Sequence, residues 1–593
     1  MMMFKIKNIF NYHRPITVLL VIVLMLTFVP VLDTILVVGN SWQGITPTFI
    51  DENLYQAHVQ NIGEGYLNDG NPYFLEHRYD PPLVIFGGAW INAVPIFTGL
   101  SFNATLLLNF VLWSLVFAAL FYRLFRELAV PRWFAVVGTL LQYLQFYPYM
   151  WRSANLQPVL PFYVLFYIAI VRLIREQNRR NIYLLAAATG ASFYLYAYLW
   201  QTIFITLGLL FLYALVRKNW GLMRATLLSS FIGGIIGLPV PLYTLWLSRS
   251  SPYFWESISR FGLVNTHLPM AEIIYSGGWI GIVLAFLAIL YWRSRTLRED
   301  SVFISLALFL CVSGLGLWIM QGSNLFTGKL LETGEHIRVF IFPWLAFATV
   351  LLGSYLWKRR ADLSLGLQVF SFVVIVVCAV VSLRYANAAF YTFSHPEAHR
   401  EFWQTQQLYA KPFAWLESQE KSPIVVWNEP HNPFSPLVPI FTKHFVLFAS
   451  PAMWQLVSDD EFRERYLVSQ YFSDPTVASL KSDMWTYLGR QDAFHKAKTI
   501  ERGIKICRIL FFWDKNKDCG TPPTAIGLLG EKFFSDLEQK FRTDIKPNIK
   551  EYLKKYHVSY VIKDTVLDLQ YHPEKLGATR VYSDERFEIY RLP

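Results

Sequence analysis

The sequence predicts a polytopic α-helical membrane protein with about eleven spans, followed by an α/β domain outside the membrane. Three observations support this fold class. Of the 593 residues, 54% are hydrophobic and only 16% are charged, whereas about a quarter of the residues in soluble globular chains are charged. Apolar runs of spanning length recur as far as residue 384 and then stop. The connections between these runs are alternately rich and poor in Lys and Arg.

The apolar runs define the predicted spans. A membrane-spanning helix needs about 20 predominantly apolar residues, and the first run, 15–38, exceeds this length. No small-residue cleavage site follows it, so we expect a retained span and not a cleaved signal peptide. The other predicted spans are 103–122, 133–149, 156–174, 183–197, 201–216, 225–248, 272–292, 301–320, 338–357 and 365–384.

Lys and Arg predict the orientation. Six alternate connections, beginning with the N-terminal segment, each carry three or more basic residues, and the intervening connections carry no more than two. The positive-inside rule then predicts a multi-pass protein of the plasma membrane (a bacterial-type inner membrane) with a cytoplasmic N-terminus. Residues 1–384 form the membrane domain, and 385–593 lie outside. The net charge of +11 partly reflects this bias, so we expect the lipid bilayer and no nucleic acid as a partner.

Two neighbouring acids, Asp51 and Glu52, stand in the first outside loop, 39–102. Asp51 can cap an amphipathic helix over 51–66, which we expect to lie on the outer membrane surface. The turn HRYDPPL then blocks helical backbone before its prolines, and a second surface helix is predicted over 83–99. The first outside loop therefore holds a carboxylate pair close to the membrane.

The order of these features resembles the opening of the GT-C glycosyltransferases. These are membrane enzymes that depend on polyprenol-phosphate sugars, such as protein O-mannosyltransferases and lipid A aminoarabinose transferases. Residues 335–352 (EHIRVFIFPWLAFATVLL) are similar to the late RYLLPxLPxLALL span of that family. The region after residue 385 resembles the small outer α/β domain of many bacterial members. The likeness extends over most of the chain.

The resemblance implies an inverting glycosyltransferase that moves a hexose or pentose from a polyprenol-phosphate sugar to an acceptor glycan, lipid or protein outside the membrane. It makes Asp51 the general base, with Glu52 as its partner, and Arg338 the cation that faces the donor phosphate. The attacking hydroxyl needs a base, and the departing phosphate needs Arg or a bound divalent metal. Because the donor carries the energy of the reaction, the enzyme needs no nucleotide site. The chain accordingly shows no Gly-rich phosphate loop.

One departure from the family pattern concerns the metal. Family members often carry a second acid in the motif R-x-A-x-x-D-x-P, whereas residues 152–158 here read RSANLQP. Arg152 fits the motif, but Asn155 and Gln157 occupy the region of the acid. Their amides can hydrogen-bond a sugar, whereas the metal ligands stay unidentified. No HExxH motif or Cys/His cluster offers an alternative.

Other candidate residues surround the expected site. His336 precedes Arg338, and the loop 249–271 is long enough to fold over a cavity, with Arg260 and His267 able to meet phosphate. Aromatic runs at 142–151 and 192–200 fit an interfacial belt or a wall against which a sugar or isoprenoid stacks. The residues that flank the HRYDPPL turn either brace the loop or contact ligand: His77, Arg78 and Asp80.

The outer domain is predicted from alternating helices and strands, which indicate an α/β layer structure. The predicted elements are strands at 424–428, 444–450 and 508–514, a helix at 459–472, a helix that leads into a strand over 549–564, and a hairpin over 580–592. Cys507 and Cys519 bracket the third strand and can form a disulfide in an oxidising compartment. Two other functions fit the same features: a polymerase, ligase or flippase for lipid-linked glycans, and a non-catalytic membrane scaffold.

Overall fold

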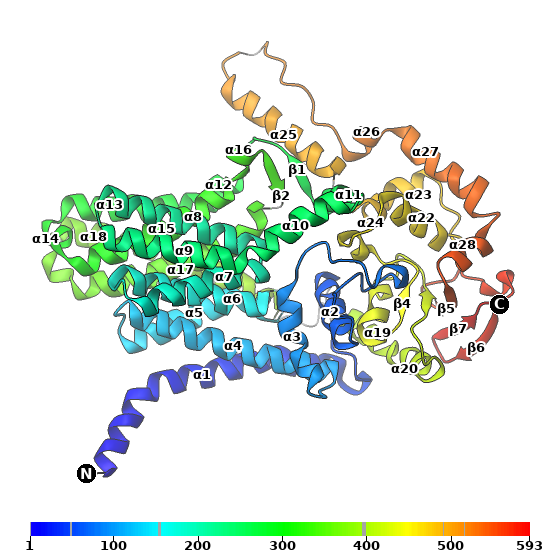
Figure 1. Ribbon diagram of the computed structural model, residues 1–593, viewed down its shortest axis with the longest axis horizontal. Coiled ribbons are helices and arrows are strands. Elements are labelled where there is room, and N and C mark those ends of the chain that lie inside the picture. Colours follow the sequence, from blue (N-terminus) through cyan, green and yellow to red (C-terminus); the bar gives the residue numbers. More distant parts are fainter. Residues whose placement is uncertain are drawn as a thin grey trace.

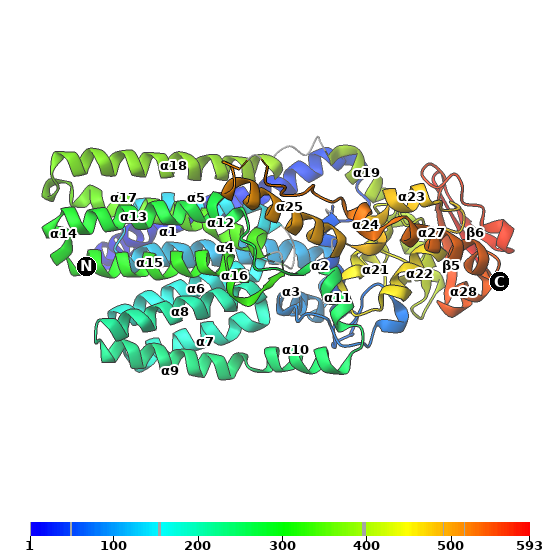
Figure 2. The ribbon, with the colours of Figure 1, turned by 90° about the horizontal axis from the view of Figure 1, so that it is seen from above.

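The computed structural model describes residues 2–47, 50–151, 156–331, 333–393, 399–489, 492–514 and 516–593. A helical bundle forms one end of the molecule and a C-terminal domain with a small sheet forms the other (Figure 1). Seen from above, the bundle helices run side by side along the long axis of the molecule (Figure 2).

Within the part of the chain that the structure describes, eleven long helices make up the bundle. They are α1 (Met2–Val38), α4 (Phe102–Glu127), α5 (Arg132–Trp151), α6 (Leu156–Arg175), α7 (Arg179–Leu195), α8 (Ala197–Val216), α9 (Trp220–Gly237), α13 (Gly277–Arg293), α15 (Ser301–Gln321), α17 (Thr333–Lys358) and α18 (Leu365–Phe393). Within the described residues, nine segments are long and apolar enough to cross a membrane, and all of these except α5 and α7 contribute one. A count of eleven spans therefore stays a prediction.

The predicted span 225–248 has the wrong bounds, since the helix of spanning character there is Trp220–Gly237. The chain forms two helices there, α9 and α10 (Pro239–Ser250), and only α9 has the length and composition of a span. The break follows from Pro239, which lacks an N–H group for the ladder of α9 and is placed in the first turn of α10. The helix α10 continues toward the C-terminal domain (Figure 2).

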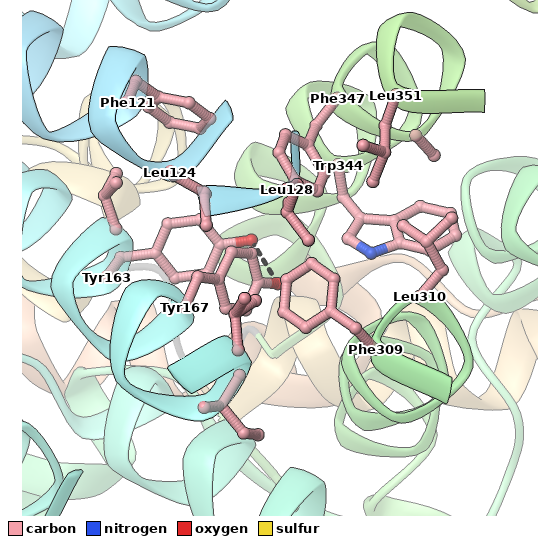
Figure 3. Close-up of a cluster of buried hydrophobic side chains, with 14 of the residues drawn as sticks. Phe121, Leu124, Leu128, Tyr163, Tyr167, Phe309, Leu310, Trp344, Phe347 and Leu351 are labelled. Carbon is pink, nitrogen blue, oxygen red and sulfur yellow. Dashed lines mark hydrogen bonds between the residues drawn. The ribbon is translucent and has the colours of Figure 1, made fainter. Parts of the chain in front are cut away.

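Aromatic side chains fill the centre of the bundle. Figure 3 shows Tyr163 and Tyr167 of α6 between rings of α4, α15 and α17, with the Tyr163 hydroxyl donating to that of Tyr167 at 2.6 Å. The indole of Trp344 donates to Ser313 Oγ at 2.9 Å. Elsewhere small residues bring helices together: a Cβ atom on Gly237 of α9 would lie 2.1 Å from the Phe193 ring of α7. Close approach at glycine is typical of membrane helix pairs.

Basic connections meet at the end of the bundle that lies away from the C-terminal domain. Glu127, the last residue of α4, binds Arg172 at 2.6 Å, and Lys358 Nζ donates to the Ala129 carbonyl at 2.8 Å. Arg359 pairs with Asp300 at 2.6 Å, close to α14 (Arg295–Glu299), which Figure 1 shows at the far end. The alternation of basic loops along the chain thus corresponds to one end of the bundle in space.

Short elements connect the spans at the opposite end. They are α2 (Ile50–Gly63), α3 (Gly87–Phe97), α11 (Phe254–Arg260), β1 (Leu263–Asn265), α12 (Glu272–Tyr275), α16 (Asn324–Thr327) and β2 (Lys329–Leu331). Strands β1 and β2 pair antiparallel. The predicted loop over 249–271 is therefore folded, and its α11 packs against the C-terminal domain through Phe254 and Leu456.

The C-terminal domain is built on a five-stranded sheet in the order β4-β3-β5-β7-β6. Strands β4, β3 and β5 are parallel, and β7 and β6 are antiparallel to their neighbours. The strands are β3 (Val425–Trp427), β4 (Phe445–Val446), β5 (Val558–Asp564), β6 (Thr579–Ser583) and β7 (Phe587–Arg591). The helices are α19 (Arg400–Leu408), α20 (Ala410–Gln419), α21 (Val438–Phe441), α22 (Asp459–Ser469), α23 (Val477–Ser482), α24 (Met484–Leu488), α25 (Asp492–Leu510), α26 (Ala525–Leu529), α27 (Glu531–Lys540) and α28 (Ile549–Lys555).

Several predicted elements of this domain are confirmed, and one is wrong. The strand near 424–428, the transition from helix to strand over 549–564 and the closing hairpin are all present. Cys507 and Cys519 form a disulfide. The predicted strand over 508–514 is instead the end of α25 followed by a turn, and its large apolar side chains are exposed.

Candidate functional site

The helix α2 lies between the bundle and the C-terminal domain. Leu54 and Ala57 belong to the hydrophobic core of the C-terminal domain, whereas Val59 and Ile62 pack on α3. The predicted surface helix is therefore covered by the C-terminal domain and by α3, which the sequence did not predict. The polar side chains of α2 are buried as well: Glu52, Asn53, Gln56, His58 and Asn61.

A cavity of about 620 Å³ lies where α2 meets α1 and α4. Most of its wall is apolar, and its polar groups come from α1, from α2, from the segment before α2 and from the start of α4. Its lining residues are Val31, Thr34, Ile35, Gly39, Trp42, Thr46, Pro47, Glu52, Gln56, Asn103, Ala104, Leu106, Leu107 and Phe110. Ligand pockets in proteins have volumes of about 300–1,000 Å³.

The cavity is open at the flank of the bundle. Three large apolar side chains in its lining are exposed, namely Ile35 (57%), Trp42 (47%) and Leu107 (40%). Ile35 and Leu107 belong to two helices of spanning character. An apolar molecule can therefore enter sideways between α1 and α4 without crossing the polar end.

Hydrogen bonds hold the polar end of the cavity in place. Asn103 Oδ1 accepts from the Thr46 hydroxyl at 2.5 Å, and its amide donates to the Gly44 carbonyl. Gln407 of α19 donates to the Ile45 carbonyl at 2.7 Å and accepts from the Ile45 N–H at 3.2 Å. The C-terminal domain thus fixes the segment that leads into α2.

Glu52 is the only charged residue among those that line the cavity in the described part of the chain. Its side chain is 4% exposed. Within the same described residues, no Lys or Arg lines this cavity. The side chain of Asp51 lies outside the described residues, as do Arg152 and Asn155.

A second buried set of polar groups supports α2 from the other side. His58 Nδ1 lies 2.6 Å from Asp69 Oδ1, and both side chains are almost completely buried. Burial raises the pKa of Asp69, and the neighbouring His58 lowers it. Gln455, from the C-terminal domain, places its amide nitrogen 3.0 Å from His58 Nε2. Because the Gln455 amide donates, the His58 proton is on Nδ1 and faces Asp69.

His77 and Asp80 join the segment between α1 and α4 to the C-terminal domain. His77 Nδ1 lies 2.6 Å from Asp80 Oδ2, and Nε2 lies 3.0 Å from Glu461 Oε1 on α22. Burial opposes the charge on His77, but its two carboxylate partners raise the pKa of His77 to about 9. For Glu461, burial is outweighed by His77 and Arg465, which lower the pKa to about 2.

Arg465 extends the same network. Its side chain is fully buried, and it binds Glu461 and Glu76 at 2.8 Å each. Arg78 lies over the Tyr79 ring at 4.7 Å, within a turn that a side chain at Gly70 would obstruct, since a Cβ atom there would lie 2.4 Å from the Arg78 carbonyl oxygen. The residues that flank the HRYDPPL turn thus contact the C-terminal domain and the loop itself.

His336 lies with the aromatic residues of the 192–200 run. Its Nδ1 is 2.5 Å from the Tyr196 hydroxyl, and its ring stacks on Tyr198 with centroids 4.5 Å apart. Arg338, one turn into α17, is exposed and lies in electrostatic range of Tyr385 on α18. Arg338 is not among the residues that line the Glu52 cavity.

The helix α5 lies between α1, which lines the Glu52 cavity, and α17, which carries His336 and Arg338. Its Tyr147 hydroxyl donates to the Leu26 carbonyl of α1 at 2.9 Å. Its Phe146 ring packs near the ring of Phe340 on α17, with the ring centroids 6.4 Å apart. The shared cavity that was expected for Asp51 and Arg338 stays a prediction, because one of the two side chains is not described.

The remaining candidates are engaged in structural contacts. The Arg260 guanidinium pairs with Asp459 and donates to the Val457 carbonyl at 2.6 Å, so it fastens α11 to the C-terminal domain. His267 Nδ1 lies 3.1 Å from the Leu325 carbonyl oxygen, near α16. Gln157 is fully buried, and its amide donates to the Met150 carbonyl at 2.6 Å.

The sequence analysis missed the uncharged members of the site. Gln56 lies one helical turn after Glu52, and the two line the same cavity. The spacing of four residues between Glu52 and Gln56 is the sequence signal that places both on one face of the helix. Asn103 had no signal beyond its place at the start of a span. Gln455 and Gln407 are far away in sequence, so no local pattern marks them.

Comparison with models of known protein families gave no match, and comparison with curated proteins gave none either. Among the residues that the structure describes, no group of three or more His, Cys, Asp or Glu side chains is arranged to hold a metal ion. The cavity itself offers one carboxylate with neutral amides and hydroxyls. We assign no reaction step to a metal, and the divalent metal that the resemblance allows stays a prediction.

Proposed function

We propose that this chain is a membrane glycosyltransferase of the GT-C type. It transfers a sugar from a polyprenol-phosphate donor to an acceptor hydroxyl on the side of the membrane that carries the C-terminal domain. The supporting observation is the cavity between α1 and α4, which joins an apolar, laterally open wall to a buried carboxylate. The basic connections at the opposite end of the bundle support an extracytoplasmic location for this site.

The shape of the cavity suits a donor with two chemically different ends. Ile35, Leu107 and Phe110 offer an apolar surface for the first isoprene units, while the rest of the prenyl chain stays among lipids. Gln56 and Asn103 offer amides at the polar end, where they can orient sugar hydroxyls. Lateral entry keeps the prenyl chain in the membrane while its head group reaches α2.

The acid pair supplies the base in this proposal. The acceptor oxygen attacks the anomeric carbon, its proton passes to a carboxylate, and the bond from that carbon to the phosphate oxygen breaks. The prenyl phosphate leaves with the electron pair, and the configuration inverts. The family resemblance assigns the base to Asp51, and the position of Glu52 in the cavity wall supports a role for the pair. General-base catalysis typically contributes 10²–10⁴-fold.

The departing phosphate needs a cation, and the described part of the cavity wall has none. Arg338 remains the candidate, on the far side of α5 from α1. Because the phosphate links the prenyl chain to the sugar, it lies between the α1–α4 opening and α2. We therefore propose that its non-bridging oxygens face α5 and α17, the direction in which Arg338 lies.

The test uses the purified protein in nanodiscs with a panel of radiolabelled polyprenol-phosphate hexoses and pentoses. Loss of label from the lipid fraction identifies the donor. Asp51→Asn and Glu52→Gln are then compared with Glu64→Gln, an exposed acid directly after α2. We expect the Asp51 variant to lose about 10²–10⁴-fold in rate, the Glu52 variant to lose less, and the Glu64 variant to keep its rate.

Folding of each variant is checked by gel filtration and by its melting temperature. Full turnover in a protein that carries both Asp51→Asn and Glu52→Gln would reject the acid pair as the base. Donor binding without any turnover in the unaltered protein would instead favour a flippase or a scaffold.

A further inference from the structure

An arm projects from the C-terminal domain. It comprises residues 492–524, of which all but 515 are described. The helix α25 leads outward, and the chain returns without regular structure (Figure 1). The disulfide between Cys507 and Cys519 joins the outgoing helix to the returning chain close to the far end of the arm.

The far end of the arm is apolar and exposed. Five consecutive residues, here called the apolar tip, are exposed to the following extents: Ile509 70%, Leu510 55%, Phe511 40%, Phe512 78% and Trp513 67%. Large contiguous apolar surface of this kind is rare on soluble domains and marks a contact with a protein or a membrane. The disulfide holds this tip in shape although no core surrounds it.

The middle of α25 lies against the end of the bundle. A Cβ atom on Gly503 would lie 3.4 Å from Leu268 Cδ1, directly after β1. The partner strand β2 leads straight into the span α17. From Gly503, α25 continues for seven residues, a rise of about 10 Å. In both views its far end lies at the level of α12 and α16 along the long axis, not at the level of the sheet (Figures 1 and 2).

Other exposed apolar side chains occur at the same level. Ile274 and Tyr275 on α12 are 75% and 77% exposed, and Phe326 on α16 is 82% exposed. The helix α12 directly precedes the span α13, and α16 directly follows the span α15. Aromatic residues at the ends of spans are typical of the membrane interface. The apolar tip therefore lies at the same level as the exposed apolar residues of α12 and α16, at the ends of the spans.

The charges of the arm match the surface of an anionic leaflet. Residues 496–519 contain seven Lys or Arg and three Asp or Glu. Two of these acids are engaged in turns, since Asp514 accepts from the Asn516 N–H at 3.1 Å and Asp518 from the Gly520 N–H at 2.7 Å. Basic residues beside aromatic and aliphatic ones are the pattern of segments that lie in the headgroup region.

We propose that the apolar tip inserts into the leaflet next to the C-terminal domain, at the boundary between headgroups and acyl chains. The basic residues of α25 then lie among anionic headgroups. The arm thus gives the C-terminal domain a second attachment to the membrane, besides its contacts with the bundle. This proposal does not depend on the enzymatic activity.

The test places a photoreactive benzoyl-phenylalanine at Phe512 in the full-length protein. The protein is reconstituted in nanodiscs of phosphatidylcholine and phosphatidylglycerol, irradiated, and analysed for covalent lipid adducts. The same analogue at Phe372 on α18 (69% exposed) is the lipid-facing reference. The analogue at Leu569 (70% exposed), on the C-terminal domain, is the matched control. A second probe at Trp513 guards against a local defect at 512.

We expect the probes at 512 and 513 to give lipid adducts at a level similar to the probe at 372, and at least about tenfold above the probe at 569, as for a segment in the interface. Adducts at 372 without adducts at 512 and 513 would overturn the proposal. A cross-link from 512 or 513 to a second copy of the chain, in place of lipid, would overturn it as well.

Discussion

The contact of His77 with Glu461 should make the junction between the first outside loop and α22 sensitive to pH. The pKa of His77 is raised from its ordinary value of 6.5 to about 9 by Asp80 and Glu461, against the effect of burial. A group with a raised pKa stabilises the folded state fully below its unfolded pKa and loses this effect as pH rises to its folded pKa. The junction should therefore be most stable below about pH 6.5 and weaken toward pH 9.

The size of the effect follows from the same values. A pKa difference of one is worth about 1.4 kcal/mol, so the rise from 6.5 to about 9 corresponds to about 3 kcal/mol. The His77 side chain is only 17% exposed, so solvent screens this contact weakly. The lowered pKa of Glu461 reflects the same contact with His77, so it adds no further free energy to this value. About 2 kcal/mol should remain at pH 7.5.

Hydrogen–deuterium exchange of the protein in nanodiscs measures this stability directly. Peptides from 70–82 and 459–469 should lose about a hundredfold in protection between pH 6 and pH 9, after correction for the intrinsic pH dependence of exchange. His77→Gln should show lower protection at pH 6 and almost no further loss. His572→Gln, at an exposed position of the same domain, serves as the control. An equal pH dependence in His77→Gln and the unaltered protein would refute the reasoning.

The remaining predictions concern orientation and packing. A cysteine at Asp460, whose side chain is 92% exposed, should react with an impermeant maleimide from outside intact cells, whereas one at Glu176 should not; the reverse result would invert the predicted orientation. Gly87→Ala should cost about 1–3 kcal/mol of stability, because a Cβ atom there would lie 2.3 Å from the Tyr194 carbonyl oxygen. Gly278→Ala has no atom within 4 Å and should change the melting temperature little; equal melting temperatures for the two variants would contradict the packing.

Local patterns in the sequence predicted much of the fold. The helices of the bundle follow from apolar runs, because an apolar helix of the right length satisfies its own backbone in lipid. The hairpin over 580–592 is marked by its central Ser583–Asp584 pair, and Asp584 does accept from the Phe587 N–H at 2.7 Å. These features depend on neighbours in sequence, and a single chain is enough to recognise them.

The errors have physical causes as well. An exposed apolar run such as 508–514 has the same composition as a buried strand, and only the folded surroundings distinguish the two. The polar contact of α2 with Gln455 joins residues almost 400 positions apart in the sequence, so no local pattern marks it. Of the residues that line the cavity, Glu52 was a candidate from order and resemblance. The lateral opening between α1 and α4 had no such signal, because it depends on how two helices distant in sequence pack against each other.

The position of α2 has a consequence for the role of the C-terminal domain. One face of this helix, through Glu52 and Gln56, lines the cavity, and another, through Leu54 and Ala57, belongs to the core of the C-terminal domain. A helix that is packed into a core moves with that core, since protein interiors are close-packed and yield little. The domain is thus part of the site and not a separate module attached after the last span. Under the proposed function, an acceptor that binds the C-terminal domain acts on the same rigid element that carries the carboxylates, so acceptor choice and catalysis are joined through α2.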